Sequence, residues 1–307
     1  MSEDNEEQAG TSCCASCGIA EIDDVKLKDC DGCDLVRYCS DECRENHRSE
    51  HEEACKKRAA ELRDEQLYKQ PESSHLGDCP ICCLPLPLDL MKSTLTGCCS
   101  KLICTGCFYA NQMRELEQNL ATKCTFCREA LSKTEEEHFK RLMRRIEKND
   151  PYAIYQQGAE QYDKGDYRSA FEYWKKATDL GNVDAHHRLA GLYIFGKGVE
   201  QEEGKIIHHL EEAAIAGHPE ARYNIGYHKW NNGDKEGAVK HWIIAATLGE
   251  DDSTKMLMKA FKEGHVSKED YAAALRAHKA AVDATKSPQR DIAEKFVAIY
   301  REGGKQH

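Results

Sequence analysis

The cysteines are the residues of this chain best suited to chemistry, and they gather in its first part. All 17 lie between Cys13 and Cys127, and the residues from Arg128 to His307 have none. The initial stretch MSEDNEEQAGTS is acidic and lacks the basic, apolar and small-residue order of a secretory signal, so we expect an intracellular protein without disulfides. Thiolates with two or three residues between them can converge on one tetrahedral zinc ion. The cysteines therefore predict zinc binding.

The first cluster occupies residues 13–55 and offers eight ligands in four pairs. The pairs are Cys14-x2-Cys17, Cys30-x2-Cys33, Cys39-x3-Cys43 and His51-x3-Cys55. A spacing of two forms a zinc knuckle, whereas a spacing of three places both side chains on one face of a helical turn. Eight ligands fit two zinc ions.

This segment resembles the MYND zinc finger, including the Tyr38-Cys39-Ser40 step and the closing His-x3-Cys. The ligands of that family interleave along the chain. The resemblance therefore assigns Cys14, Cys17, Cys39 and Cys43 to one ion and Cys30, Cys33, His51 and Cys55 to the other. MYND fingers generally hold short proline-containing peptides, which implies a binding module with structural zinc. Cys13 and His47 remain outside these sets, and we expect a solvated thiol and a surface imidazole.

A second cluster occupies residues 77–130, and its CPIC and CxFCR segments resemble a RING finger. The resemblance implies one ion bound by Cys79, Cys82, Cys104 and Cys107. It gives the other ion Cys124, Cys127, Cys99 and a histidine, but Lys101 stands at the histidine position.

Lys101 is a poor zinc ligand because its amine loses a proton only near a pKa of ~10.4, whereas a thiolate forms readily beside zinc. The neighbouring Cys98 is a better donor, and Gly97 permits a turn that brings Cys98 and Cys99 to one ion. We predict both as ligands, which makes four zinc ions in all. Lys101 is then either exposed or a cation beside the thiolates, and Cys83 is a weaker candidate ligand because it directly follows Cys82.

RING fingers that act as ubiquitin ligases hold a charged ubiquitin-conjugating enzyme and form no covalent intermediate. The contact positions of that family map onto Ile81 and Arg128. Two departures oppose this activity: Thr125 stands where proline is usual, and residues 108–123 contain no tryptophan. The resemblance thus implies a ligase and leaves a non-catalytic scaffold open.

The cysteine-free part of the chain repeats itself from Asp150 onward. Trp174, Leu210 and Trp242 each stand seven residues before a glycine, with periods of 36 and 32. Such a repeat is typical of a helix-pair solenoid. Its second unit, with LAGLY and GKGV, resembles the Sel-one-like branch of the tetratricopeptide superfamily, which implies a concave surface for protein partners. The paired histidines 186/187 and 208/209 diverge by about 100° on a helix, so we expect them at the surface.

The predicted fold is multi-domain: two small zinc-stabilised α+β fingers precede an all-α helix-pair solenoid. Its parts are an acidic disordered tail (1–12), the first finger (13–55), a linker helix (56–76), the second finger (77–130), a connecting helix (131–149) and the repeats with a capping helix (150–307).

Charge and hydropathy narrow the choice of partners. A net charge of −11 disfavours general attraction to nucleic acid, and no apolar run approaches the ~20 residues needed to span a membrane. With nucleic acid and membrane disfavoured, we expect the partners to be proteins. We predict a cytoplasmic or nuclear zinc-binding adaptor, with a RING-type ubiquitin ligase and a purely structural scaffold as the two hypotheses for its function.

Overall fold

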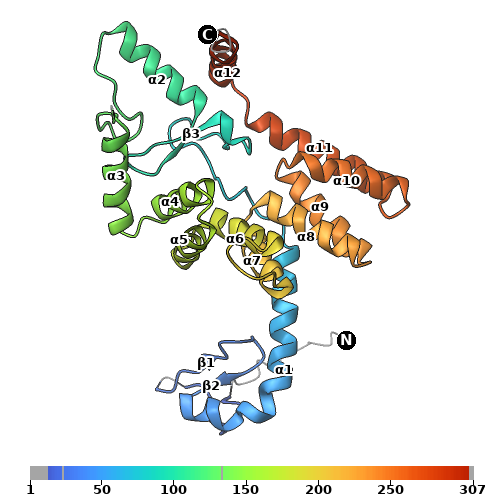
Figure 1. Ribbon diagram of the computed structural model, residues 1–307. Helices are drawn as coiled ribbons and strands as arrows, with labels where there is room; N and C mark the ends of the chain where they lie inside the picture. The colour runs from blue at the N-terminus through green and yellow to red at the C-terminus, as the bar shows by residue number, and fades with distance from the viewer. Residues whose placement is uncertain (1–12, 23, 133, 304–307) are drawn as a thin grey trace, which may run out of the picture. The chain divides into compact units, whose positions relative to one another are not determined.

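The computed structural model describes residues 13–22, 24–132 and 134–303, with side chains up to Phe296 (Figure 1). The acidic tail predicted at 1–12 lies outside the described residues. The chain forms two compact units, Met1–Lys69 and Gln70–His307. In the described residues, no helix is both long and apolar enough to cross a membrane.

The first unit contains a short hairpin and one long helix. Strands β1 (Lys28–Asp29) and β2 (Arg37–Tyr38) pair antiparallel. Helix α1 (Asp41–Tyr68) begins at Ser40, whose hydroxyl accepts the Cys43 N–H at 3.2 Å and caps the first turn. The helix runs without interruption from the ligand region into the segment that we predicted as a linker helix at 56–76.

The second unit opens with a small α+β finger. A 3₁₀ turn η1 (Leu90–Lys92) leads into strands β3 (Ser93–Leu95) and β4 (Leu102–Cys104), which pair antiparallel, and helix α2 (Thr105–Glu117) follows. Its buried centre contains Leu86 and Ile103 together with three predicted ligands, Cys79, Cys104 and Cys107. Because this core is so small, metal binding must supply much of the stability.

A helical array forms the rest of the second unit. Its helices are α3 (Glu135–Glu147), α4 (Pro151–Asp163), α5 (Tyr167–Asp179), α6 (Val183–Phe195), α7 (Glu203–Ile215), α8 (Pro219–Asn231), α9 (Lys235–Thr247), α10 (Asp251–Lys262), α11 (Lys268–Ala284) and α12 (Pro288–Gly303). The pairs α4–α5, α6–α7 and α8–α9 pack most closely, and each pair packs on the next (Figure 1). The predicted fold class, two fingers followed by a helix-pair solenoid, is confirmed.

The repeat period reflects one packing contact inside each pair. A Cβ atom on Gly158 would lie 2.5 Å from the Trp174 ring, and one on Gly226 would lie 2.5 Å from the Trp242 ring. Each indole also donates its N–H to a backbone carbonyl of the preceding helix, at 3.1 and 3.2 Å. A glycine therefore gives the tryptophan room to pack between the two helices of its pair. In the middle unit, Ala190 and the smaller side chain of Leu210 occupy these positions, and both are buried.

Candidate metal centres

The structure brings all sixteen predicted ligands together in four sets, each with its donor atoms within 4.8 Å of one another. The sets are Cys14, Cys17, Cys39 and Cys43; Cys30, Cys33, His51 and Cys55; Cys79, Cys82, Cys104 and Cys107; and Cys98, Cys99, Cys124 and Cys127. Ligands from distant parts of each finger interleave, as the resemblances imply.

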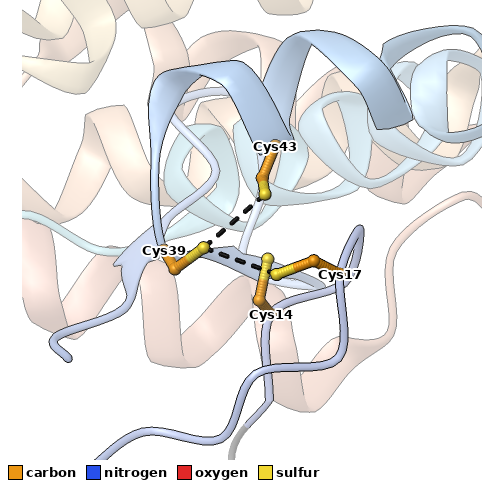
Figure 2. Close-up of side chains that lie close together, drawn as sticks. All are labelled: Cys14, Cys17, Cys39 and Cys43. Carbon is orange, nitrogen blue, oxygen red and sulfur yellow. Dashed lines mark hydrogen bonds between the residues drawn. The ribbon is translucent and has the colours of Figure 1, made fainter.

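The spacing within the sets fits zinc. Four sulfurs at about 2.3 Å from one ion lie about 3.8 Å apart at the corners of a tetrahedron. In the set of Figure 2, Cys39 Sγ lies 3.6 Å from both Cys17 Sγ and Cys43 Sγ. In the other sets, the distances between Sγ atoms are 3.7 Å for Cys30–Cys55, 3.8 Å for Cys82–Cys104, 3.9 Å for Cys99–Cys124 and 3.3 Å for Cys98–Cys127. Cys33 Sγ lies 3.2 Å from His51 Nε2. All the cysteines are free thiols, so the sets are candidate metal sites and not disulfides.

Three of the knuckles share one backbone turn. The N–H of the first cysteine donates to the carbonyl five residues on, in the pairs Cys14–Ile19, Cys79–Leu84 and Cys124–Glu129, at 2.7–2.9 Å. The residue four positions on donates back to the carbonyl of that cysteine and has positive φ: Gly18 (74°), Cys83 (54°) and Arg128 (63°). The turn points the side chains of its first and fourth residues to one side, as a metal ion requires.

The same turns favour thiolate at their first cysteine. Burial raises the pKa of the Cys14 and Cys124 thiols, but hydrogen bonds from backbone N–H groups outweigh it and lower these pKa values to about 6 and about 7. For Cys79, the hydrogen bond with Cys104 is the largest influence and lowers the pKa to about 4 against the effect of burial. At Cys14 and Cys124 the backbone thus favours an anion where the metal needs one.

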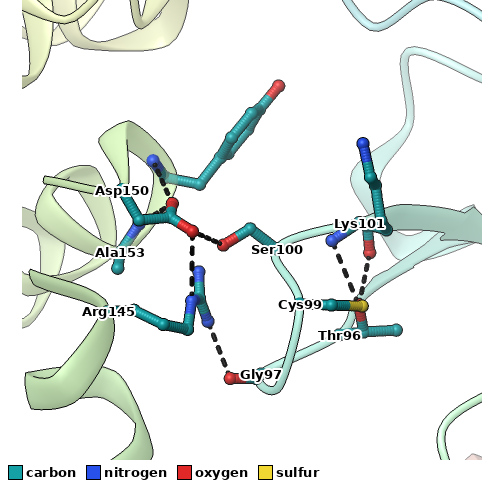
Figure 3. Close-up of polar contacts among 9 residues, drawn as sticks. Thr96, Gly97, Cys99, Ser100, Lys101, Arg145, Asp150 and Ala153 are labelled. Atoms are coloured by element: carbon teal, nitrogen blue, oxygen red, sulfur yellow. Dashed lines mark hydrogen bonds and ion pairs between the residues drawn. The ribbon is translucent and has the colours of Figure 1, made fainter. Parts of the chain in front are cut away.

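A fourth turn, at residues 96–101, explains the lysine in the RING-like pattern. The Thr96 N–H donates to the Lys101 carbonyl at 2.9 Å, the Ser100 N–H donates back to the Thr96 carbonyl at 3.0 Å, and Ser100 has φ of 54°. This is the knuckle turn with Thr96 in the place of its first cysteine and Cys99 in the place of its second (Figure 3). The hydroxyl lies 3.1 Å from Cys99 Sγ. Cys98, between them, supplies the thiol that Thr96 lacks.

Lys101 lies outside the ligand set. Its backbone closes the turn, with its N–H donating to Thr96 Oγ1 at 3.1 Å and its carbonyl accepting from the same hydroxyl at 2.9 Å (Figure 3). Its side chain is exposed, and Nζ lies 5.8 Å from the centre of the Phe126 ring. The sequence carried a signal that our reasoning missed: Thr96 stands three residues before Cys99, which is the knuckle spacing.

Two cysteines and one histidine of the finger segments lie outside the four ligand sets. Cys83 occupies the positive-φ position of its knuckle and is exposed, and Cys13 is exposed as well. His47 is not the surface imidazole that we predicted, because only 20% of its side chain is exposed. Its Nδ1 lies 3.1 Å from the Tyr38 hydroxyl, and its ring stacks on the ligand His51 at 5.7 Å. His47 therefore helps to orient a metal ligand.

The two predicted enzyme-contact residues differ in their surroundings. Ile81 is 42% exposed at the third position of its knuckle turn. The Arg128 guanidinium donates to Asn111 Oδ1 at 2.8 Å and to Glu115 Oε1 at 3.2 Å, and Glu115 is almost fully buried. Arg128 thus ties the last knuckle to α2, while 45% of its side chain stays exposed.

The helical array holds the turn at 96–101 through polar contacts that the sequence did not predict (Figure 3). Arg145 of α3 donates to the Gly97 carbonyl at 2.7 Å, and Ser100 donates to Asp150 at 2.6 Å. Asp150 also caps α4 by accepting the N–H groups of residues 152 and 153. Burial raises the pKa of Asp150, but the hydrogen bonds and the charge of Arg145 lower it below its usual value, so Asp150 is a carboxylate.

A further cluster of possible ligands, formed by His75, Asp184 and His218, does not suit a metal ion. The two imidazoles stack with their planes 8° apart and their centres 4.2 Å apart. A metal ion lies in the plane of each imidazole that binds it, and two stacked planes share no such point. Burial keeps the pKa of His218 well below its usual value, and Nδ1 accepts the Ala221 N–H, so Nε2 carries the proton of the neutral ring. These residues attach the start of the second finger to the array by hydrogen bonds.

The paired histidines of α6 and α7 correct another prediction. His187 packs against His218 with ring centres 4.5 Å apart, and Nδ1 of His186 and Nδ1 of His209 lie 3.1 Å apart. Burial lowers the pKa of His187 and of His209 to about 4. The surface prediction is wrong for His187 and His209 because it considered each helix without its neighbours.

Fold and sites together define a zinc-binding helical-repeat protein. Residues 14–55 match the family model of the MYND finger, so the first finger is a MYND finger. No curated protein matches the chain.

Among solved structures, the chain is similar to a Sel1 repeat protein from Oxalobacter formigenes, with 21% identity over 64% of this chain and 86% of that chain and a TM-score of 0.43. It is also similar to c5321, a protective antigen present in uropathogenic Escherichia coli strains displaying an SLR fold. The identity there is 19% over 54% of this chain and 37% of that chain, with a TM-score of 0.38.

Proposed function

We propose that this protein is an adaptor whose second finger works as a RING-type ubiquitin ligase, while its MYND finger and helical array select protein partners. The zinc fingers and the repeat fold support the adaptor role. Each zinc set has four protein donors, which leaves no open position for a substrate or a reactive water. The chemistry of such sites is structural, so function rests on the surfaces that they hold.

The observation that carries the ligase proposal is the pair of exposed apolar side chains on the second finger. Ile81 and Phe126 occupy the third position of their respective knuckle turns, and both are 42% exposed. The first knuckle of the MYND finger has Ser16 at this position. Exposed apolar side chains on rigid turns suit the docking of a folded protein such as a conjugating enzyme.

Arg128 supports the same role with its remaining donors. A guanidinium has five N–H groups, and Arg128 uses two of its nitrogens for Asn111 and Glu115. The buried Glu115 fixes the position of the side chain, and its exposed part is available to bridge two bound proteins.

The MYND finger is proposed to bind a short peptide that contains proline. Apolar side chains suited to such a ligand are exposed on it, at Ile19 (49%), Ile22 (58%) and Leu35 (53%). Proline-rich peptides lose little conformational entropy on binding and dock against exposed apolar side chains.

Ubiquitin discharge from a broad panel of charged conjugating enzymes tests the ligase proposal. We expect discharge with wild type. Ile81→Ala should weaken enzyme recruitment by ~1–3 kcal/mol, and Arg128→Ala should lower the discharge rate about tenfold or more. Arg114→Ala is the matched control, because Arg114 also contacts Asn111 from α2 but lies outside the knuckle. Zinc content and helical circular dichroism must equal those of wild type in each variant.

The alternative is a non-catalytic scaffold, and the attachment of Arg128 to α2 favours it. An arginine that stabilises the finger by binding α2 has a structural role even in a finger that transfers no ubiquitin. Absence of discharge with every enzyme in the panel, from protein with full zinc content, would establish the scaffold over the ligase.

A further inference from the structure

Arg290 of the C-terminal helix reaches a zinc ligand of the second finger. Its side chain is almost fully buried, and one terminal nitrogen lies 3.3 Å from Cys82 Sγ and 3.1 Å from the Leu84 carbonyl. The other terminal nitrogen donates to the carbonyls of Pro85 and Thr285, at 2.7 and 2.6 Å. A single guanidinium thus binds the Cys82 thiol and the loop that follows it.

The packing around Arg290 leaves it little freedom. A Cβ atom on Gly106 of α2 would lie 3.0 Å from the Arg290 backbone, so the two helices meet where only a glycine fits. Further along α12, the Phe296 and Tyr109 rings pack with their centres 4.5 Å apart, and Glu294 pairs with Lys92 at 2.9 Å. The close approach at Gly106 presents the guanidinium to the zinc loop in one orientation, and the contacts of Phe296 and Glu294 hold the next part of α12 on the finger.

In the two other cysteine knuckles that share this turn, the corresponding cysteines are not covered. Cys17 and Cys127 hold the second ligand position of their turns, as Cys82 does, and both are exposed. Cys82 is half-buried, under a cation that belongs to the helical array.

We propose that Arg290 is a positioning residue of the zinc site formed by Cys79, Cys82, Cys104 and Cys107. Four thiolates around one zinc ion carry a formal charge of −2, and a hydrogen bond from a guanidinium offsets part of it at Cys82. Loss of zinc requires a thiolate to leave the ion. A thiolate held by Arg290 leaves less readily, so the C-terminal helix slows zinc loss from this site.

Transfer of zinc from the full-length, zinc-loaded protein to a chromogenic chelator tests this proposal. Removal of a hydrogen-bonding partner of a metal ligand typically lowers metal affinity by about 10–100-fold. We therefore expect one of the four ions to leave Arg290→Ala at least about tenfold faster than it leaves wild type. The transfer rates of the other three ions should not change. Arg276→Ala controls for net charge, because Arg276 is exposed on the neighbouring α11.

A second control separates the hydrogen bond from helix packing. Phe296→Ala loosens α12 on α2 but leaves the guanidinium at Cys82, so it should change zinc transfer much less than Arg290→Ala does. Equal acceleration by both variants would overturn the proposal, and so would an Arg290→Ala trace identical to wild type.

If Arg290→Ala does not fold, Arg290→Lys decides the question. Lysine keeps the charge but lacks the planar fork that reaches several acceptors at once. We expect faster zinc loss from this variant than from wild type, and equal rates would contradict the role of Arg290.

Discussion

The two fingers have nearly the same donor chemistry but differ in what holds their ligands in place. In the MYND finger, α1 carries three of the eight ligands, Cys43, His51 and Cys55, and the finger belongs to a compact unit without the repeats. The second finger shares its unit with the helical array, and Arg290, Arg145 and Asp150 contact its zinc loops. Similar metal sites can therefore be stabilised locally or by distant parts of the chain.

The physical reason lies in the backbone of the loops. The carbonyls of Pro85 and Gly97 accept from Arg290 and Arg145 of the array. The Leu84 carbonyl accepts from Arg290 in addition to the Cys79 N–H, so the array supplies partners to these loops from outside the finger. The first unit provides its own partners: the Arg37 guanidinium donates to the Leu27 carbonyl at 3.0 Å, and Arg58 of α1 binds the Asp34 carboxylate at 2.7 and 2.8 Å.

Zinc removal should have the largest effect and should separate the fingers most clearly. Structural zinc supplies roughly 10–16 kcal/mol to small finger peptides, so chelation should unfold both fingers. We expect amide hydrogen exchange to rise in residues 14–55 and 79–127, and also at the start of α4 and in α12. Helices α8 and α9 should keep their protection.

Unchanged exchange in α12 and α4 after chelation would show that the array does not depend on the second finger. Collapse of α8 and α9 would show that the dependence extends through the whole array.

Substitutions in the turn at 96–101 should give the next largest effect. Cys98→Ser should release about one zinc ion, because a structural site with three ligands is no longer closed, while Lys101→Ala should keep all four. Adding Thr96→Cys to Cys98→Ser should restore the fourth ion, because residue 96 occupies the first ligand position of a knuckle turn. Elemental analysis measures each outcome. A Cys98→Ser protein with four ions beside a Lys101→Ala protein with three would reverse our ligand assignment.

Asp150 should give the smallest effect, on stability. Asp150→Ala and Asp166→Ala each remove a helix N-cap, at a cost of ~1 kcal/mol, but only Asp150 also binds Ser100 and Arg145. Losing hydrogen bonds to a charged group should cost a further ~1.5–3 kcal/mol in the free energy of unfolding. Denaturant unfolding compares the variants, and Asp150→Asn, which keeps the cap, should fall between wild type and Asp150→Ala. Equal losses from the two alanine variants would mean that Asp150 is only a cap.

The sequence predicted the ligand sets better than their surroundings. Spacing and resemblance placed fifteen ligands, and the chemistry of lysine and thiol pointed to Cys98. The glycine and tryptophan period predicted the helix pairs because one contact recurs in each unit. Arg290 carries no such signal, since it lies 208 residues from Cys82 and a single arginine in a helix looks like any surface cation.

Arg290 is synthesised long after the ligands of the zinc site that it contacts. Ribosomes add about 5–20 residues each second, so the roughly 180 residues between Cys107 and Arg290 take about 10–40 s to make. During that interval the nascent chain has every ligand of the zinc site but not the arginine that covers Cys82. A polypeptide that stops before Pro288 has the ligands and remains in this state, and rapid loss of zinc would distinguish it from finished protein.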